Sequence, residues 1–218
     1  MRSPIEVFSN WVDTGKDEGM EKNHFKPVIK MIDLFDTKKE FTCIDAGCGN
    51  GWLVKYLSKM NNCKKAIGVD GSSKMIAKAK KHSDNEFYCS DLLEWKPKNK
   101  VDVVFSMEVF YYFKKPEILI QHIYDNWIKN DGKLIMGIDH YYENEECHDW
   151  KKQINVDTME LVKIKEWDIY KAVRPYTYKS CSQELISYKE PNYHKRYKFF
   201  AFDKDMNSSV WQGYMNKD

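Results

Sequence analysis

The strongest constraint on the fold is a stretch in which an apolar strand pattern breaks into alternating glycines and then runs into a helix pattern. Residues 41–46 have the composition of a buried strand, glycines occupy positions 47, 49 and 51, and an amphipathic helix pattern covers residues 53–60. Glycine allows the backbone to turn sharply and to approach a ligand closely, and the first N–H groups of a helix have no partners inside it. The sequence therefore predicts a ligand-binding loop after the first strand of an α/β sheet.

The spacing of the glycines separates this loop from two common nucleotide-binding loops. The dinucleotide fingerprint places its third glycine three residues after the second, where this chain has Trp52, and the phosphate loop requires a Gly-Lys-Ser/Thr sequence that is missing. The pattern Asp45-x-Gly47-x-Gly49-x-Gly51 resembles the first motif of class I S-adenosylmethionine-dependent methyltransferases. The cofactor of that family carries an α-amino group and no phosphate, so an acid at the strand end suits it. The resemblance implies that the cofactor is bound by Asp45, Gly47, Cys48, Gly49 and Gly51.

A second strand pattern at residues 65–70 ends in Asp70, about 20 residues past the glycines. A carboxylate at this position can reach both hydroxyl groups of a ribose held over the first loop. A turn follows, and we expect Ser73 to be the N-cap of a lysine-rich helix. The resemblance implies that Gly71, Ser72 and Met75 lie beside the ribose and the adenine.

The third strand pattern, at residues 86–93, also closes with an acid. The resemblance assigns Asp91 to the adenine amino group and Leu92 to the face of the base. A single aspartate at a strand end is most often a turn or cap residue. Three of them beside one crevice, Asp45, Asp70 and Asp91, favour a binding site.

The fourth strand pattern begins at Val101 and leads into an aromatic loop that, in the family, lies beside the transferred methyl group. The resemblance therefore places three cofactor-binding residues here, namely Ser106, Met107 and Glu108. It also implies that residues 106–112 border the reaction centre.

Strand and helix patterns alternate five times up to a fifth strand at residues 133–139, which predicts a doubly wound parallel sheet. A helix is expected at residues 158–172 and two final strands at 176–188 and 194–202. In the family these strands form an antiparallel edge. The fold class is therefore α/β, with a mostly parallel seven-stranded sheet and an antiparallel edge.

We expect one domain over residues 1–218, since the chain is of ordinary domain size. Residues 1–40 would be an N-terminal lid and helix segment, 41–139 the cofactor-binding core, and 140–218 a substrate-side insertion with the final strands. Residues 1–24 are polar and do not have the pattern of a core segment. The resemblance makes four residues of this segment lid candidates, of which Trp11 is expected to contact the cofactor: Trp11, Gly15, Met20 and His24.

Composition limits the partners and the compartment. The net charge is +2, with 35 basic and 33 acidic residues, so no overall field selects nucleic acid or a membrane surface. The six cysteines form no C-x-x-C pair, and no long apolar run or N-terminal apolar segment is present. These features predict a cytoplasmic protein that neither spans a membrane nor binds nucleic acid; its oligomeric state is left open.

Candidates for catalysis lie after the fourth and fifth strands, and a base is needed only if the acceptor arrives protonated. The main candidates are Tyr111, Tyr112 and His140, and Glu108 and Tyr142 could also act. Metal-binding residue types gather between His140 and His148, but their spacing is not that of a zinc site, so we expect no metal. A basic, tyrosine-rich stretch at 188–198 could contact RNA, although a solvated loop before a last strand is the better explanation.

Three functions compete: a small-molecule methyltransferase, an RNA or protein methyltransferase, and a non-catalytic S-adenosylmethionine-binding protein. The balanced charge and the lack of an Asn-Pro-Pro-Tyr-type motif favour the first. Aromatic residues near the reaction centre suit an acceptor that becomes positively charged, such as an amine.

Overall fold

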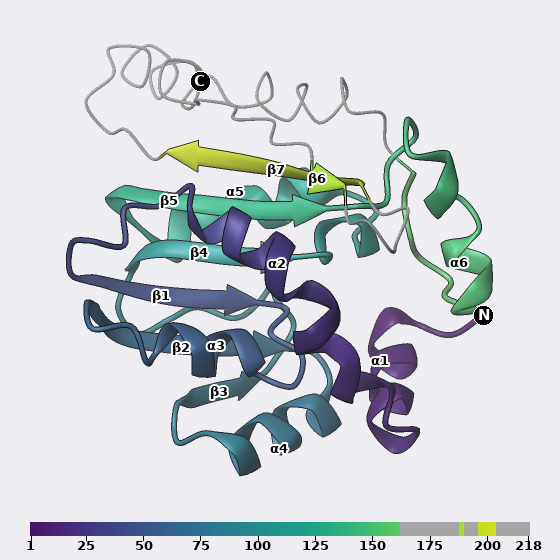
Figure 1. Cartoon of the computed structure of the whole chain (residues 1–218), viewed down its shortest axis with the longest axis horizontal. Helices are drawn as coiled ribbons and strands as arrows, with labels where there is room; N and C mark the ends of the chain where they lie inside the picture. Colours follow the sequence, from purple (N-terminus) through teal and green to yellow (C-terminus); the bar gives the residue numbers. More distant parts are fainter. Residues whose placement is uncertain (162–187, 190–195, 204–218) are drawn as a thin grey trace.

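The computed structural model describes residues 1–161, 188–189 and 196–203. Its centre is a seven-stranded sheet of order β3-β2-β1-β4-β5-β7-β6 (Figure 1). The strands are β1 (Phe41–Ala46), β2 (Cys63–Asp70), β3 (Glu86–Cys89), β4 (Val101–Met107), β5 (Ile128–Ile138), β6 (Tyr188–Lys189) and β7 (Arg196–Asp203). The first five are parallel, and β7 pairs antiparallel with β5 and β6. The predicted fold class is confirmed.

Helices cover both faces of the sheet, and α1 and α6 lie beyond its carboxyl edge (Figure 1). The helical segments are α1 (Pro4–Asp13), η1 (Lys16–Gly19), α2 (Met20–Ile32), α3 (Trp52–Leu57), α4 (Ser73–His82), η2 (Phe110–Tyr112), α5 (Pro116–Asn126), η3 (Glu145–Cys147) and α6 (Trp150–Gln153). Alternate residues of β4 enter separate cores: Val104 packs with the side chains of α5, whereas Val103 and Phe105 pack with those of α2, α3 and α4. Because both faces are buried, the central strands are mostly apolar, with Asp45 and Asp102 among the exceptions. No helix in the described part of the chain is both long and apolar enough to cross a membrane.

Several predicted boundaries are wrong. The fifth strand begins at Ile128 instead of residue 133, because α5 already ends at Asn126. The third strand stops at Cys89, and the N-cap of α4 is Ser72, whose Oγ accepts the Met75 N–H. Residues 158–161 are not helical, and the rest of the helix expected at 158–172 lies outside the described residues, as does most of the expected strand at 176–188.

The N-terminal segment is also more structured than its polar composition predicts. Ser3 and Glu6 form a capping box that begins α1, with Pro4 in the first turn. Val7 on this helix is fully buried in the core, and Asp17 is fully buried with its carboxylate paired to Lys78 at 2.8 Å. The prediction that residues 1–24 contain no core segment is therefore wrong.

This segment is attached to the rest of the protein at several points. The Arg2 N–H donates to the Asn155 carbonyl at 3.0 Å and the Asp157 N–H donates to the Arg2 carbonyl at 2.8 Å. Further along, the Ser9 and Ser72 hydroxyls are 2.7 Å apart. The first helix is thus held against residues 155–157 at one end and against α4 at the other.

Candidate active site

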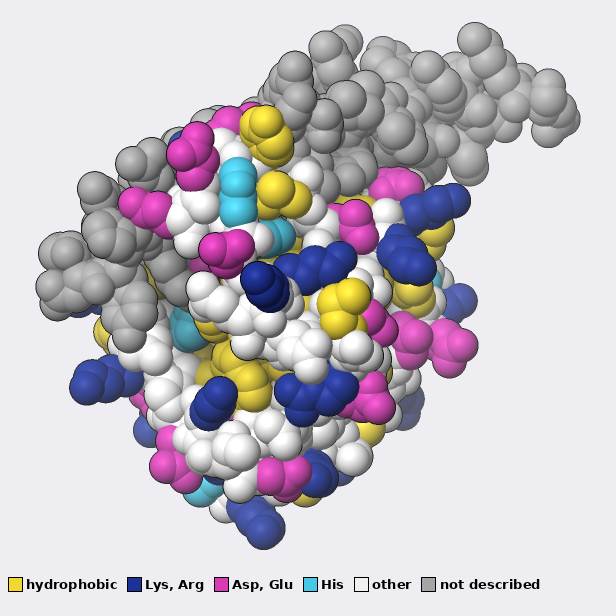
Figure 2. Space-filling view, turned by 90° about the vertical axis from the view of Figure 1, so that its right-hand side faces the viewer, with side chains coloured by type: hydrophobic (Ala, Val, Ile, Leu, Met, Phe, Trp, Pro, Cys, Tyr) yellow, Lys and Arg dark blue, Asp and Glu magenta, His cyan; other side chains and the backbone are white. Residues whose placement is uncertain are grey.

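A cavity of about 910 Å³ lies at the carboxyl ends of the parallel strands and is walled on one side by α1, η1 and α2. This is the edge where open α/β sheets bind ligands, and the volume is at the upper end for small-molecule sites. Figure 2 shows this face of the molecule, with hydrophobic side chains visible among charged ones. The cavity has room for a nucleoside-sized cofactor and a second small molecule.

The glycine loop between β1 and α3 forms the floor of the cavity. Gly47 has φ +79°, and a Cβ there would lie 2.4 Å from Cγ2 of Val109. Gly49 has φ +51°, and a Cβ there would lie 2.7 Å from Cε of Met20. Both positions favour glycine for backbone conformation, and at Gly47 the space is also closed by Val109, whereas the flexible end of Met20 beside Gly49 can move.

Asp70, at the tip of β2, is oriented by two backbone groups. Its Oδ2 accepts the Gly49 N–H at 2.9 Å and its Oδ1 accepts the Ser72 N–H at 2.8 Å. Each carboxylate oxygen has more than one lone-pair site, so both oxygens keep capacity for a ligand hydroxyl. Burial raises the pKa of Asp70, while these two hydrogen bonds lower it.

Asp45, at the end of β1, is almost fully buried and lines the same cavity. Burial, and next the charge of Asp70, raise the pKa of Asp45 to about 8. Most Asp45 carboxyl groups are therefore protonated at pH 7 in this state. A cationic ligand group beside Asp45 would favour its ionised form, which fits the α-amino group expected here.

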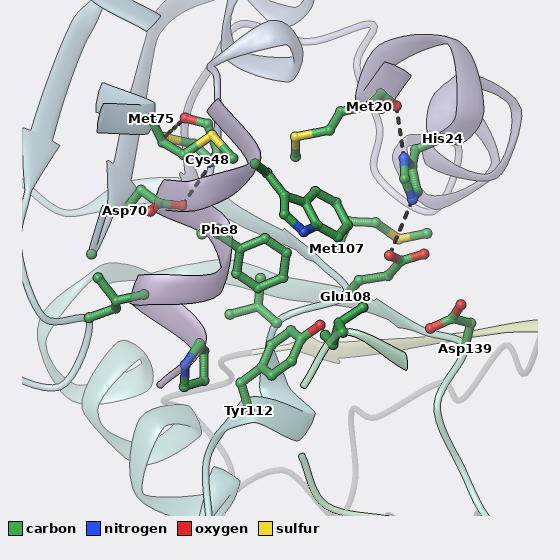
Figure 3. A pocket seen from close by; sticks show the side chains of 18 of the residues that line it. Phe8, Met20, His24, Cys48, Asp70, Met75, Met107, Glu108, Tyr112 and Asp139 are labelled. Carbon is green, nitrogen blue, oxygen red and sulfur yellow. Dashed lines mark hydrogen bonds and ion pairs between the residues drawn. The ribbon is translucent and has the colours of Figure 1, made fainter. Parts of the chain in front are cut away.

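The other side of the cavity is built by the ends of β4 and β5. Glu108, just after β4, has φ +57°, and its N–H donates to the Gly137 carbonyl at 2.9 Å. His24 on α2 places Nε2 3.2 Å from Oε2 of Glu108 and Nδ1 2.8 Å from the Met20 carbonyl (Figure 3). Asp139, just after β5, accepts the Tyr111 hydroxyl at 3.2 Å.

An aromatic wall joins α1 to the loop after β4 and to α6. Phe8 contacts Trp11 and Tyr112 edge to face, with ring centroids 5.0 and 5.3 Å apart, and Trp11 lies 6.4 Å from Trp150. Burial, followed by the charges of Glu108 and Asp139, raises the pKa of Tyr112 far above its ordinary value. Tyr112 therefore carries its proton at neutral pH, which argues against a role as general base.

The structure brings most of the predicted site residues together. Those lining the cavity are Trp11, Asp45, Gly47, Cys48, Gly49, Asp70, Gly71, Met75, Asp91, Leu92, Met107, Glu108 and Tyr112. Figure 3 shows Cys48, Asp70 and Met75 on one side of the cavity and Glu108 and Asp139 on the other.

Five predicted site residues lie behind this lining. A Cβ at Gly51 would meet Ala79 and Phe87 in the core, Ser106 donates to the Ala46 carbonyl, and Ser72 caps α4. Tyr111 is fully buried behind Asp139. His140 is buried with Nδ1 near the Cys147 carbonyl, and burial lowers the pKa of His140 to about 4, so this histidine is neutral at pH 7.

Sequence reasoning did not identify Phe8, Asn23 or Trp150 as lining residues. Phe8 was detectable, because Ser3-Pro4-Ile5-Glu6 is a capping-box pattern that predicts a helix over the following residues. Asn23 and Trp150 depend on how α2 and α6 pack, which no local pattern encodes. In the described part of the chain, no group of three or more His, Cys, Asp or Glu side chains is arranged to hold a metal ion.

Fold and cavity together define a doubly wound α/β protein whose glycine loop opens onto a nucleoside-sized site. A family model described as a methyltransferase domain matches residues 44–136. Residues 44–136 are therefore a methyltransferase domain of the class I S-adenosylmethionine-dependent type.

Individual relatives are distant. The chain is 31% identical to carboxy-S-adenosyl-L-methionine synthase of Nautilia profundicola over 62% of each chain. It is 27% identical to malonyl-[acyl-carrier protein] O-methyltransferase of Acetivibrio thermocellus over 59% of this chain and 46% of the relative. The chain thus spans less than two thirds of these relatives. A solved structure of similar fold comes from the complex between the Haloferax volcanii Trm112 methyltransferase activator and a methyltransferase. One chain of that complex superposes on this chain with a TM-score of 0.75 at 20% sequence identity, and the match covers 94% of this chain and 99% of that one. The two chains therefore share a fold.

Proposed function

We propose that this protein transfers the methyl group of S-adenosylmethionine to a small-molecule acceptor. The observation that carries the proposal is the convergence of three carboxylates, Asp45, Asp70 and Asp91, on a glycine loop that a single Cβ would obstruct. A sulfonium cofactor supplies an activated methyl group, and the protein has to align that group with the acceptor.

The roles of the cofactor-side residues follow from their positions. Asp70 would accept both ribose hydroxyls, because its oxygens are already oriented by Gly49 and Ser72. Asp45 would bind the α-amino group, whose charge compensates the buried carboxylate. Asp91 and Leu92 would bind the adenine beyond the end of β3. The glycine loop itself supplies close backbone approach.

The acceptor side would align the two reactants and exclude water. The aromatic wall of Phe8, Trp11 and Tyr112 lies over the ends of β4 and β5, next to Met107 and Glu108. An acceptor bound there would attack the methyl carbon of the cofactor, and the aromatic wall would hold it in position. A cavity walled by α1 suits a small acceptor better than a macromolecular one.

The test has two arms. Calorimetry measures binding of S-adenosylmethionine and S-adenosylhomocysteine, and incubation with tritium-methyl cofactor measures transfer to an ultrafiltered yeast extract or to total RNA and protein. We expect binding of both compounds and label in the small-molecule fraction. Label only in macromolecules would favour an RNA or protein methyltransferase. Binding without transfer in either arm would favour a non-catalytic binding protein.

A further inference from the structure

All five parallel strands end at a carboxylate that faces the same cavity. The acids lie within the last two residues of the strand or within two residues after it: Asp45 on β1, Asp70 on β2, Asp91 after β3, Glu108 after β4 and Asp139 after β5. Three of them are on the β1-β2-β3 side, where the proposed function places the cofactor. Two, Glu108 and Asp139, are on the β4-β5 side, where the acceptor would lie.

The lining of the cavity is rich in carboxylates. Among the described residues that line the cavity, Lys16 is the one lysine and no arginine occurs, whereas Glu146 adds a sixth carboxylate. Burial is the main cause of the raised pKa of Tyr112, and the charges of Glu108 and Asp139 raise it further. A carboxylate or phosphate acceptor would be repelled here, and a cation would be attracted.

The aromatic wall adds a second, independent preference for a cation. Phe8, Trp11 and Tyr112 line the cavity beside the two acids, and their edge-to-face contacts fix the orientation of the rings. Ring faces attract ammonium groups that have lost part of their water. An anionic acceptor would gain nothing from this surface.

His24 and Glu108 form a pair that can hold a proton. Nδ1 of His24 faces the Met20 carbonyl, which only accepts, so Nδ1 carries a hydrogen. The 3.2 Å hydrogen bond between Nε2 of His24 and Oε2 of Glu108 then requires a proton on one of these two atoms. Without it, a nitrogen lone pair faces a carboxylate, so the proton-free pair attracts a proton from a nearby donor.

We propose that the methyl acceptor is an amine, bound as its ammonium form by Glu108 and Asp139 and deprotonated by the His24–Glu108 pair. The ammonium N–H bond breaks, the proton goes to Nε2 of His24, and the electron pair remains on nitrogen. That pair forms the N–C bond as the C–S bond breaks, and the C–S electrons pass to sulfur. The products are a methylated ammonium ion and S-adenosylhomocysteine. The proton on His24 then leaves to water.

This inference rests on the proposed methyl transfer, so its test separates the two. The protein is incubated with tritium-methyl cofactor and ultrafiltered yeast extract, and the labelled product is divided by cation exchange and by alkaline hydrolysis. Label in a base-stable fraction retained on the cation exchanger supports an amine acceptor. Label released by alkali as volatile methanol, or found in a neutral or anionic product, overturns the amine while methyl transfer stands. No label in any product overturns both.

Variants then test the residues. Glu108→Gln and Asp139→Asn should each lower kcat/KM for the isolated acceptor by about 10- to 100-fold, while cofactor affinity measured by calorimetry stays within about twofold. Glu145→Gln, an exposed neighbour outside the cavity lining, is the matched control and should have no effect. A parallel loss of cofactor affinity would assign the two acids to the cofactor and overturn the proposal.

The test of His24 has to distinguish a catalytic role from a purely structural one. His24→Ala should lower kcat by roughly 100-fold or more, and added imidazole should restore part of the activity because it can enter the space left by the side chain. Unchanged kcat, or a loss that imidazole does not relieve in a protein with wild-type melting temperature, would remove His24 from the mechanism.

Discussion

The backbone N–H of Gly49 donates a 2.9 Å hydrogen bond to Oδ2 of Asp70, which joins the glycine loop after β1 to the tip of β2. The two motifs that sequence analysis treated separately are therefore one structural unit. Since Ser72 holds the other oxygen, the carboxylate is oriented before any ligand arrives. Such preorganisation reduces the entropy lost on binding.

Replacing Asp70 should weaken cofactor binding strongly. In Asp70→Ala the ribose would lose charge-assisted acceptors worth about 1.5–3 kcal/mol each, so the Kd should rise about 10-fold or more per bond. Calorimetry with S-adenosylmethionine checks this. Asp84→Ala, at an exposed aspartate outside the cavity, should bind as the wild type does. Equal affinities in both variants would remove Asp70 from the site.

The glycine loop gives a second prediction. Gly49→Val should abolish cofactor binding in a protein that still folds, because the branched side chain enters the cavity and strains a residue at φ +51°. Gly15→Ala is the matched control, since Gly15 also has positive φ but its Cβ would meet only Glu18, at 3.9 Å. The control should lose about 1–2 kcal/mol of stability and keep its affinity. Tight binding by the valine variant would contradict a role for the loop.

Asp45 should link stability to pH. Its pKa is about 8 in the folded protein and near 3.8 in the unfolded chain, so between these values the folded state holds a proton that the unfolded state has released. Stability then falls as pH rises from about 4 to about 8. Asp45→Asn should remove this contribution, and the difference between its free energy of unfolding and that of the wild type should grow over this range. If the free energies of unfolding of the wild type and of Asp45→Asn changed with pH in parallel, Asp45 would have the same pKa in the folded and unfolded chains.

The same group should release a proton when the cofactor binds. At pH 7 most Asp45 carboxyl groups are protonated, and the cationic amino group placed beside them by the proposed function would ionise them. Calorimetry in buffers of different ionisation enthalpy should therefore show release of up to about one proton per cofactor. Asp45→Asn should show less release along with weaker binding. Identical proton release in both proteins would place the amino group elsewhere.

We predict that Tyr111 affects acceptor binding indirectly, by orienting Asp139. Its buried hydroxyl donates to Oδ1 of Asp139, so Tyr111→Phe would remove one hydrogen-bond donor from that carboxylate without changing the cavity lining directly. We expect KM for the acceptor to rise by about tenfold, with a smaller change in kcat and unchanged cofactor affinity. Tyr88→Phe, which removes an exposed hydroxyl bonded to Glu86, is the control. A fall in kcat alone would instead indicate a direct catalytic role.

Local patterns were sufficient for the core of the fold. Apolar runs bounded by glycines predicted the positions of β1, β2 and β4. Acids at the strand ends predicted one side of the cavity, because parallel strands align their carboxyl ends. These features depend on residues close in sequence. For the same reason Asp45, Asp70 and Asp91 were identifiable without knowledge of side-chain packing.

The parts that sequence analysis missed depend on long-range packing. The pairing of His24 with Glu108 joins residues 84 apart, and no local pattern encodes it. The sequence alone does not distinguish Tyr111 from Tyr112. In the structure Tyr111 packs behind Asp139 and Tyr112 lines the cavity, because a 3-10 turn directs successive side chains to different sides. Ser72 was expected at the ribose, but its hydroxyl caps α4 and contacts Ser9.

The hydrogen bonds between Arg2 and residues 155–157 have a consequence for the order in which the site can be completed. The glycine loop lies early in the chain, whereas the segment that fastens the start of α1 comes more than a hundred residues later. A nascent chain that has not yet reached residue 155 already contains every cofactor-side acid, but its first helix has no anchor at that end. We therefore expect full enclosure of the cavity to come late during synthesis, after residues 155–157 have been made.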